Sequence, residues 1–313
     1  MLPYTVFDLH CDTLTSCGAA ASIEDTMNDP RQVVALSTLP ENTKWTQCFA
    51  IFIPDEYTGN GADGFYDHYQ KSFHRQLHKY SHLALPCRTM DDVETAWNAG
   101  KTAAILTVEN GSALGGVLSN VEKLARDGVK MMTLTWNGEN EIASGNVTDH
   151  GLSPFGHQVI PLMEEHGILV DVSHLNDTGF YQLLDVVHKP FVASHSNSRS
   201  VCGHLRNLKD DQIREMAARN CLIGLNFYDF FLREEGNAQP EDLLRHIDRF
   251  LDLGAEHCLA LGSDFDGADL PPWLNSTGKL INLHTLLLER GYSSQLCENI
   301  FHRNAADFFR SNL

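Results

Sequence analysis

The chain has 313 residues, 42% of them hydrophobic, and its 41 acidic against 23 basic side chains give a formal net charge of −18. This acidity excludes nucleic acids and anionic membranes as expected partners, because both require a basic patch. The eight cysteines form no CxxC pair, and we find neither a signal peptide nor a membrane-spanning apolar stretch, so we expect a cytoplasmic protein with free thiols.

Short apolar, β-branched segments alternate along the chain with longer segments of helical period. The predicted strands, in order, are Tyr4–Leu9, Gln47–Ile53, Ala103–Val108, Lys130–Thr135, Ile168–Val172, Pro190–Ala193, Leu222–Phe227 and Cys258–Leu261. Helices are predicted between most of them, for example over 154–166, 210–220 and 240–253, and a glycine ends several. Residues 54–102 form an insertion with two predicted helices. This alternation predicts an α/β fold, a (β/α)8 TIM barrel, with residues 1–313 as one domain.

Acidic and histidine side chains lie at the carboxyl ends of five predicted strands. In chain order they are His10 and Asp12, Glu109, His174, His195 and Asp264. In a (β/α)8 barrel these strand ends converge on one mouth, where catalytic groups sit. Imidazoles and carboxylates without a thiolate suit zinc. The sequence therefore predicts a zinc site at the mouth of the barrel.

The spacing of these residues indicates two ions. Residues two apart on a strand point to the same face, so His10 and Asp12 can bind one ion together. Glu109 has two oxygens and can link two ions, and His174 with His195 would complete the second. Two ions can activate a shared water and polarise a carbonyl. Taken singly, each histidine can also be a structural, hydrogen-bonded residue, and Glu109 can cap the following helix.

A second His-x-Asp triplet, His246-Ile247-Asp248, lies on a predicted helix. Side chains two residues apart diverge on a helix, so this pair cannot bind one ion together. We expect it to be a surface pair.

Seven motifs resemble, in order over residues 8–267, the membrane dipeptidase (renal dipeptidase) family, peptidase family M19. They are DLHCDTL, TVENG, TLTWN, GLSPFG, LVDVSH, ASHSNSRSVCGHLRNLKDDQI and GSDFDG. The resemblance implies a barrel of the metal-dependent hydrolase type, with two Zn²⁺ per chain, that hydrolyses dipeptides, often including those with a C-terminal D-residue. It also implies a homodimer.

By position, the resemblance implies that the five predicted ligands bind zinc. It implies that Arg206 holds the terminal carboxylate of the substrate, a task that suits a guanidinium, although outside this context an exposed loop arginine would be the simpler interpretation. Asp264 resembles the aspartate beside the bridging water, a candidate proton shuttle. Asp266 is then expected to be structural, in a turn before Gly267.

The chain departs from the family pattern at Trp136, where the family has a histidine thought to steady the oxyanion. An indole N–H is also a donor, but it is bulkier and uncharged. We hypothesise that Trp136 reshapes the pocket and that Asn137 or His150, on the same predicted loop, supplies the missing donor. An ordinary loop histidine is the alternative interpretation of His150.

We therefore predict a zinc-dependent dipeptidase that attacks a small peptide-like substrate with a hydroxide bridging two zinc ions. Arg206 would bind the substrate and Asp264 would relay a proton to the leaving amine. A related binuclear-zinc amidohydrolase acting on N-acyl amino acids or cyclic amides is the alternative that Trp136 keeps open. A non-catalytic metal- or peptide-binding homologue is a third, disfavoured by the five intact ligand positions. Aromatic residues in 226–232 and 271–273 can either line the pocket or pack.

Overall fold

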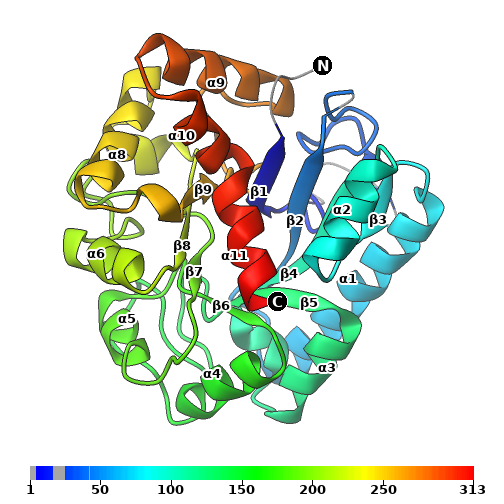
Figure 1. Cartoon of the computed structure of the whole chain (residues 1–313). Coiled ribbons are helices and arrows are strands. Elements are labelled where there is room, and N and C mark those ends of the chain that lie inside the picture. Colours follow the sequence, from blue (N-terminus) through cyan, green and yellow to red (C-terminus); the bar gives the residue numbers. More distant parts are fainter. Residues whose placement is uncertain (1–4, 17–24, 42) are drawn as a thin grey trace.

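The computed structural model describes residues 5–16, 25–41 and 43–313, and its centre is a closed barrel of parallel strands (Figure 1). The barrel strands are β1 (Val6–Cys11), β2 (Trp45–Phe52), β4 (Thr102–Glu109), β5 (Val129–Thr133), β6 (Leu169–Asp171), β7 (Val192–Ala193), β8 (Leu222–Leu225) and β9 (Leu259–Leu261). Each pairs with the next, and β9 pairs with β1, which closes the ring. The predicted TIM barrel is confirmed. The strand prediction from residue 4 begins outside the described residues.

Helices surround the barrel (Figure 1). They are α1 (Gly59–Lys79), α2 (Met90–Asn98), α3 (Ser119–Asp127), α4 (Gly156–Glu165), α5 (Asp177–Leu183), α6 (Asp210–Ala218), α7 (Asp229–Leu232), α8 (Pro240–Asp252), α9 (Leu280–Glu289), α10 (Ser294–Glu298) and α11 (Asn304–Asn312). Short 3-10 turns lie at 26–28, 111–114, 256–258 and 277–279, and a π-helical turn at 299–303 precedes α11. Local signals set their ends. Thr89 and Asp92, for example, form a reciprocal capping box at the start of α2.

The 54–102 insertion holds the two predicted helices, α1 and α2, and also a strand that the sequence analysis missed. This strand, β3 (Ala84–Pro86), pairs with the first residues of β4, outside the closed ring. Three residues ending in proline are too short to carry the alternating pattern by which a strand is recognised.

Alternating residues of the strands fill the barrel interior with two kinds of side chain. The lower interior is an apolar cluster to which every barrel strand contributes: Phe7, Leu9, Cys48, Ala103, Ile105, Met131, Leu169, Val192, Leu222 and Ala260. Helix α11 packs against this cluster, with the ring of Phe309 centred 4.9 Å from that of Phe7. Strand β4 changes from apolar to polar side chains along its inner face. Ala103 and Ile105 are followed on the same face by Thr107 and Glu109.

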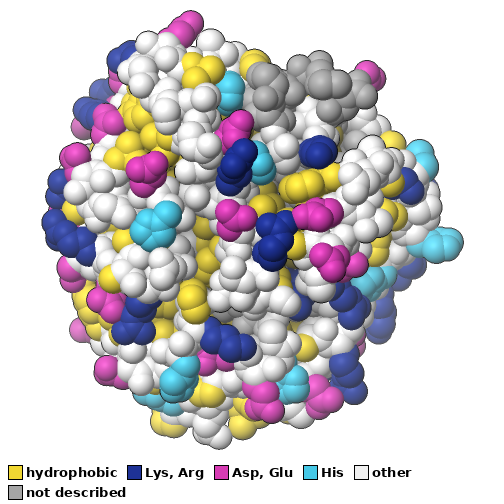
Figure 2. Space-filling view, viewed as in Figure 1, with side chains coloured by type: hydrophobic (Ala, Val, Ile, Leu, Met, Phe, Trp, Pro, Cys, Tyr) yellow, Lys and Arg dark blue, Asp and Glu magenta, His cyan; other side chains and the backbone are white. Residues whose placement is uncertain are grey.

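The face that carries α11 is chemically mixed (Figure 2). Acidic and basic side chains are interspersed there among hydrophobic ones, and Arg310 of α11 pairs with Glu94 of α2 at 2.5 Å. Seven cysteines lie in the described residues, and all seven are buried and free, as predicted. Cys17 lies outside the described residues. Across the described residues, no helix is both long and apolar enough to cross a membrane.

The prediction of a surface pair at 246–248 is wrong for its histidine. His246 lies on α8 but is fully buried. Its Nδ1 accepts a hydrogen bond from the backbone N–H of Ser198 (3.1 Å), and its Nε2 contacts the carbonyl oxygen of Leu232 (3.1 Å). Asp248 is hydrogen-bonded to the hydroxyl of Tyr292. The sequence predicts that the triplet lies on a helix. It does not predict whether His246 faces solvent or the protein, because that depends on which other segments pack against the helix.

Candidate metal centre

Glu109, the last residue of β4, is the centre of the predicted site. Its Oε2 lies 3.4 Å from His10 Nε2 at the end of β1, and its Oε1 lies 2.7 Å from His174 Nε2, just after β6. His10 Nε2 also lies 3.3 Å from Asp12 Oδ2, and His174 Nε2 lies 3.0 Å from His195 Nε2. The structure thus brings together all five predicted ligands, and the two oxygens of Glu109 face different histidines.

Two groups of ligand atoms are close enough to hold an ion, each with all atoms within 4.8 Å of one another. They are His10, Glu109 and His195, and His10, Asp12 and Asp264. His10 belongs to both groups, whereas we predicted it for one ion only. The two groups therefore overlap at His10, whose ring stacks on that of His195 with centroids 4.0 Å apart.

The outer nitrogens of two histidines are already engaged. Nδ1 of His174 lies 3.2 Å from Oδ1 of Asn137, and Nδ1 of His195 lies 2.7 Å from Oγ of Ser194. Partners of this kind fix the ring orientation and the tautomer of a metal-binding histidine, which leaves Nε2 free for the metal. Asn137, predicted as a substrate-side donor, therefore also has a contact that orients a ligand.

Burial and neighbouring charges give these groups unusual proton affinities. Burial, with the nearby Arg206, lowers the pKa of His174 to about 4, and burial lowers the pKa of His195 well below its usual value. Both imidazoles are then neutral at pH 7, which is the form that binds metals. Burial opposes charge on Glu109, but His174 and His10 hold its pKa well below the ordinary range, so it is ionised.

The residues present fit a bound divalent cation. The donor set is imidazole and carboxylate, which zinc accepts. Oδ1 of Asp12 is buried and has no hydrogen-bond partner in the described part of the chain, and burial raises the pKa of this carboxyl to about 7. A buried carboxylate oxygen without a donor is costly, and a cation beside it would remove that cost.

Several residues at the mouth have strained backbones. Asn110, His174 and Asp264, which follow β4, β6 and β9, have φ angles of 83°, 72° and 62°. Residues other than glycine rarely adopt this region, and such strain concentrates at functional sites. Gly267 shows the crowding directly, since a Cβ there would lie 1.9 Å from Oδ2 of Asp12. Any side chain at this position would displace the Asp12 carboxylate.

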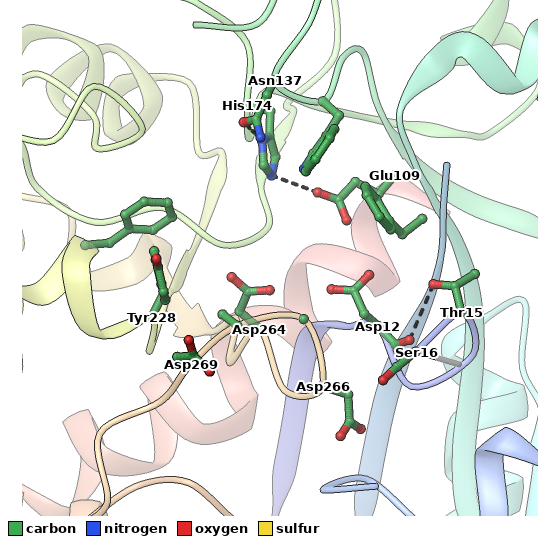
Figure 3. Close-up of a pocket in the computed structure, with 15 residues that line it drawn as sticks. Asp12, Thr15, Ser16, Glu109, Asn137, His174, Tyr228, Asp264, Asp266 and Asp269 are labelled. Carbon is green, nitrogen blue, oxygen red and sulfur yellow. Dashed lines mark hydrogen bonds and ion pairs between the residues drawn. The ribbon is translucent and has the colours of Figure 1, made fainter. Parts of the chain in front are cut away.

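A cavity of about 630 Å³ opens over these groups. Figure 3 shows the carboxylates of Asp12 and Asp264 pointing into it toward Glu109 and His174. Its lining residues are Asp12, Thr15, Ser16, Phe52, Glu109, Trp136, Asn137, His174, Tyr228, Phe231, Asp264, Asp266, Gly267, Ala268 and Asp269. In the 226–232 segment two aromatic residues therefore line the cavity. In 271–273, Trp273 is half-buried and donates to the carbonyl oxygen of Ala238, a packing contact.

Arg206 lies beside the metal ligands although it is not part of the cavity lining. It is buried, and burial lowers its pKa to about 10. Its guanidinium lies 5.4 Å from the ring centre of Phe231, and Nη2 donates a long hydrogen bond of 3.4 Å to the carbonyl oxygen of His195. Its Nε has no partner among the described residues. A buried guanidinium with an unused N–H is suited to receive an anion.

The structure places Trp136 in the cavity wall and His150 outside it. The Trp136 ring meets Phe52 edge-on at 4.8 Å and lies 6.4 Å from the ring of His174. The side chain of His150 is 70% exposed and pairs with Glu139 at 2.7 Å, which raises its pKa. His150 is not among the lining residues, so its position does not support a role as oxyanion donor.

Asp266 is held by hydrogen bonds, as expected of a structural residue. Its carboxylate accepts from the hydroxyl of Thr13 (2.5 Å) and from the backbone N–H groups of Val33 (2.7 Å) and Val34 (3.1 Å). It thus ties the segment around residue 33 to the mouth of the barrel.

Asn226, which follows β8, was missed by the sequence analysis. Its amide donates to Oδ2 of Asp264 at 3.0 Å. Its position could have identified it, because it is a polar residue near the carboxyl end of the seventh predicted strand. We assigned no site residue to that strand.

Comparison with known proteins agrees with this geometry. A family model described as membrane dipeptidase (peptidase family M19) matches residues 1–311. The chain is 29% identical over 230 residues to an uncharacterised protein from the pqqA 5′ region of Klebsiella pneumoniae, which covers 70% of this chain and 85% of that protein. It is 32% identical over 210 residues to an uncharacterised dipeptidase of Schizosaccharomyces pombe, which covers 64% of this chain but only 50% of that protein.

Solved structures cover the whole barrel. The structure of dipeptidase AC, a metallopeptidase of family M19, superposes with a TM-score of 0.93 at 25% identity, over 99% of this chain and 98% of that one. A metallopeptidase from Rhodobacter sphaeroides, solved with a phosphinate mimic of the dipeptide L-Ala-D-Ala, gives a TM-score of 0.87 at 24% identity over 99% of both chains, which shows a shared fold. The chain therefore belongs to the membrane dipeptidase family, peptidase family M19, and is a metallo-dipeptidase.

Proposed function

We propose that the protein hydrolyses dipeptides with two zinc ions held at the mouth of the barrel. The observation that carries this proposal is the position of Glu109, whose two oxygens face His10 at 3.4 Å and His174 at 2.7 Å. A carboxylate placed between two sets of imidazoles is suited to bridge two cations.

His10, Asp12 and Glu109 would hold one ion, and Glu109, His174 and His195 the other. When bound, such a pair supplies an activated water, the hydroxide proposed as nucleophile, and polarises the scissile carbonyl. The remaining tasks fall to the protein itself, which must hold the substrate, exclude other binding modes and supply a proton to the leaving nitrogen.

Arg206 is the proposed partner of the C-terminal carboxylate of the dipeptide. Its unused Nε donor and its buried charge support this role. Asp264 is the proposed proton carrier, because its carboxylate points into the cavity and its partial burial raises its pKa. A carboxyl group with a raised pKa is better able to give a proton to a leaving amine near neutral pH. The L-Ala-D-Ala mimic bound by the Rhodobacter protein supports including dipeptides with a C-terminal D-residue.

The test is metal analysis and hydrolysis on the same purified sample. We would measure zinc per chain and turnover of a panel of L,L- and L,D-dipeptides and N-acyl amino acids. We expect close to two zinc ions and turnover of dipeptides. Metal-loaded protein that cleaves none of the panel would contradict the proposal, and turnover of acyl amino acids alone would keep the site but replace the substrate.

One observation favours a second candidate, a hydrolase of N-acyl amino acids. Trp136 occupies the cavity wall within 6.4 Å of His174, where the resemblance implies a smaller histidine, so the space beside the scissile bond differs. An N-acyl amino acid still offers a carboxylate to Arg206. If this candidate is correct, Trp136→His should raise the ratio of dipeptide to acyl-amino-acid turnover. An unchanged ratio would remove the support that Trp136 gives to it.

A further inference from the structure

Asn226 sits where three parts of the site meet. It is fully buried just after β8, and its Nδ2 donates to Oδ2 of Asp264 at 3.0 Å and to the carbonyl oxygen of His195 at 3.3 Å. That same carbonyl accepts the 3.4 Å hydrogen bond from Arg206. One side chain therefore connects the proposed proton carrier, a metal ligand and, through a shared acceptor, the proposed carboxylate-binding arginine.

Asn226 is itself held in one orientation. Its Oδ1 accepts from the backbone N–H of Tyr228 at 2.6 Å, which fixes Nδ2 toward Asp264. Its backbone N–H donates to Oδ1 of Asn197 (3.1 Å), and Nδ2 of Asn197 donates back to its carbonyl oxygen (2.9 Å). This reciprocal pair joins the ends of β7 and β8. With its backbone and its side-chain oxygen both held, Asn226 can fix the direction of another side chain.

The hydrogen bond has a direct consequence for the Asp264 carboxylate. With Oδ2 engaged by Asn226, Oδ1 is the oxygen that faces the metal ligands, 3.9 Å from His10 Nε2. The backbone of Asp264 is also in the left-handed region (φ 62°), strain of the kind that concentrates at functional sites. Without the amide donor, the carboxylate would be free to rotate away from the reacting atoms or toward Arg206.

We propose that Asn226 is a positioning residue for the reaction, which fixes the rotamer of Asp264 so that Oδ1 faces the scissile bond. This inference rests on the proposed function, since it assigns Asp264 the role of proton carrier. It predicts that Asn226 affects turnover only through Asp264, and that it contributes little to substrate affinity or metal binding.

The most informative variant is Asn226→Asp. It has the same shape and keeps the oxygen that accepts from Tyr228, but it replaces the donor facing Asp264 with a second carboxylate oxygen. Loss of a hydrogen bond to a charged group corresponds to a decrease in kcat of roughly 10- to 100-fold. We expect KM and zinc per chain to stay within about twofold of the wild type, because none of the ligand side chains is replaced and the His195 carbonyl oxygen keeps its hydrogen bond from Arg206.

When two residues act as a unit, the effects of replacing them on kcat do not add. The decisive measurement is therefore a double-mutant cycle. In an Asp264→Asn background we expect Asn226→Asp to have almost no further effect on kcat. Multiplicative losses would overturn the proposal, as would a loss of zinc in Asn226→Asp or a kcat equal to that of the wild type.

Asn304→Asp is the matched control. Asn304, the first residue of α11, also donates from its Nδ2 to two carbonyl oxygens, of Glu256 (2.9 Å) and Leu259 (2.8 Å). Leu259 begins β9, so these contacts lie at the opposite end of the barrel from the site. We expect its kcat and KM to match the wild type.

A crystal structure of Asn226→Asp provides a readout that does not depend on turnover. We expect the Asp264 carboxylate to be rotated, and an unmoved carboxylate would overturn the inference. Failure of the proposed function is seen separately, because an Asp264→Asn single variant with full activity would remove Asp264 from the reaction whatever Asn226 does.

Discussion

The two halves of the barrel interior contain opposite chemistry. The lower half is apolar, drawn from all eight barrel strands and packed against α11. The upper half holds three histidines and four carboxylates: His10, His174, His195, Asp12, Glu109, Asp171 and Asp264, all but Asp264 buried. Strained residues follow β4, β6 and β9 at this upper end. The lower half stabilises the fold, and the upper half uses part of that stability to hold charges and strain that an isolated site could not sustain.

Glu109→Gln, in the upper half, should have the largest effect of these variants, and the effect should be a loss of activity. The amide is nearly isosteric but cannot bridge two cations, so we expect kcat/KM to fall by about 1000-fold or more, with loss of bound zinc. Atomic emission analysis and dipeptide turnover would measure this. Retained zinc with full activity would show that the upper half does not hold the catalytic ions.

Ile105→Ala tests the other half on the same face of the same strand. Ile105 is 2% exposed in the lower cluster, and its truncation should reduce the free energy of unfolding by about 3 kcal/mol. Urea denaturation measures the loss, and kcat/KM per folded molecule should stay within about threefold of the wild type. A loss of unfolding free energy smaller than that of Glu109→Gln would contradict the division between the halves.

Asn137→Ala and His150→Ala test which of the two residues supports the site in the upper half. Since Asn137 contacts Nδ1 of His174, its removal should loosen a ligand and lower kcat about tenfold, with some loss of zinc affinity. His150→Ala should change kcat by less than about twofold, because that side chain pairs with Glu139 outside the cavity. Steady-state kinetics on both single variants and the double variant would decide. A large loss in His150→Ala would restore it as a candidate donor.

His246 should make the loops around the mouth sensitive to acid. Burial lowers its pKa to about 4, so the folded state holds it neutral while the unfolded state protonates near pH 6.5. The unfolded state then binds more protons between these values, and the free energy of unfolding falls as the pH drops from 6.5 toward 4. We expect a loss of about 1 kcal/mol at pH 5.5 from this group. Urea denaturation of the wild type and His246→Gln at pH 7.5 and 5.5 would show it. Equal pH dependence in both proteins would exclude His246 as the cause.

The sequence determined the barrel and the location of the candidate ligands for a clear reason. Strand alternation and strand ends are local patterns, and a closed parallel barrel places every carboxyl end at one mouth. His10, Glu109 and His195 could therefore be assigned to one location before any distance was known, and the structure places them within 4.8 Å of one another. The strand β3 escaped the same reasoning because three residues are too few to show a period.

The tertiary structure alone decided which side chains face which neighbours. His246 and His150 are both single histidines near polar residues in the sequence. His246 is nevertheless fully buried against Ser198 and Leu232, whereas His150 is 70% exposed beside Glu139. Asn226 carries no motif, and only the packing of β8 between β7 and β9 directs its amide to Asp264. Local sequence fixes the element in which a residue lies. The direction of its side chain, and hence its partner, depends on contacts between segments far apart in the chain, which no local pattern records.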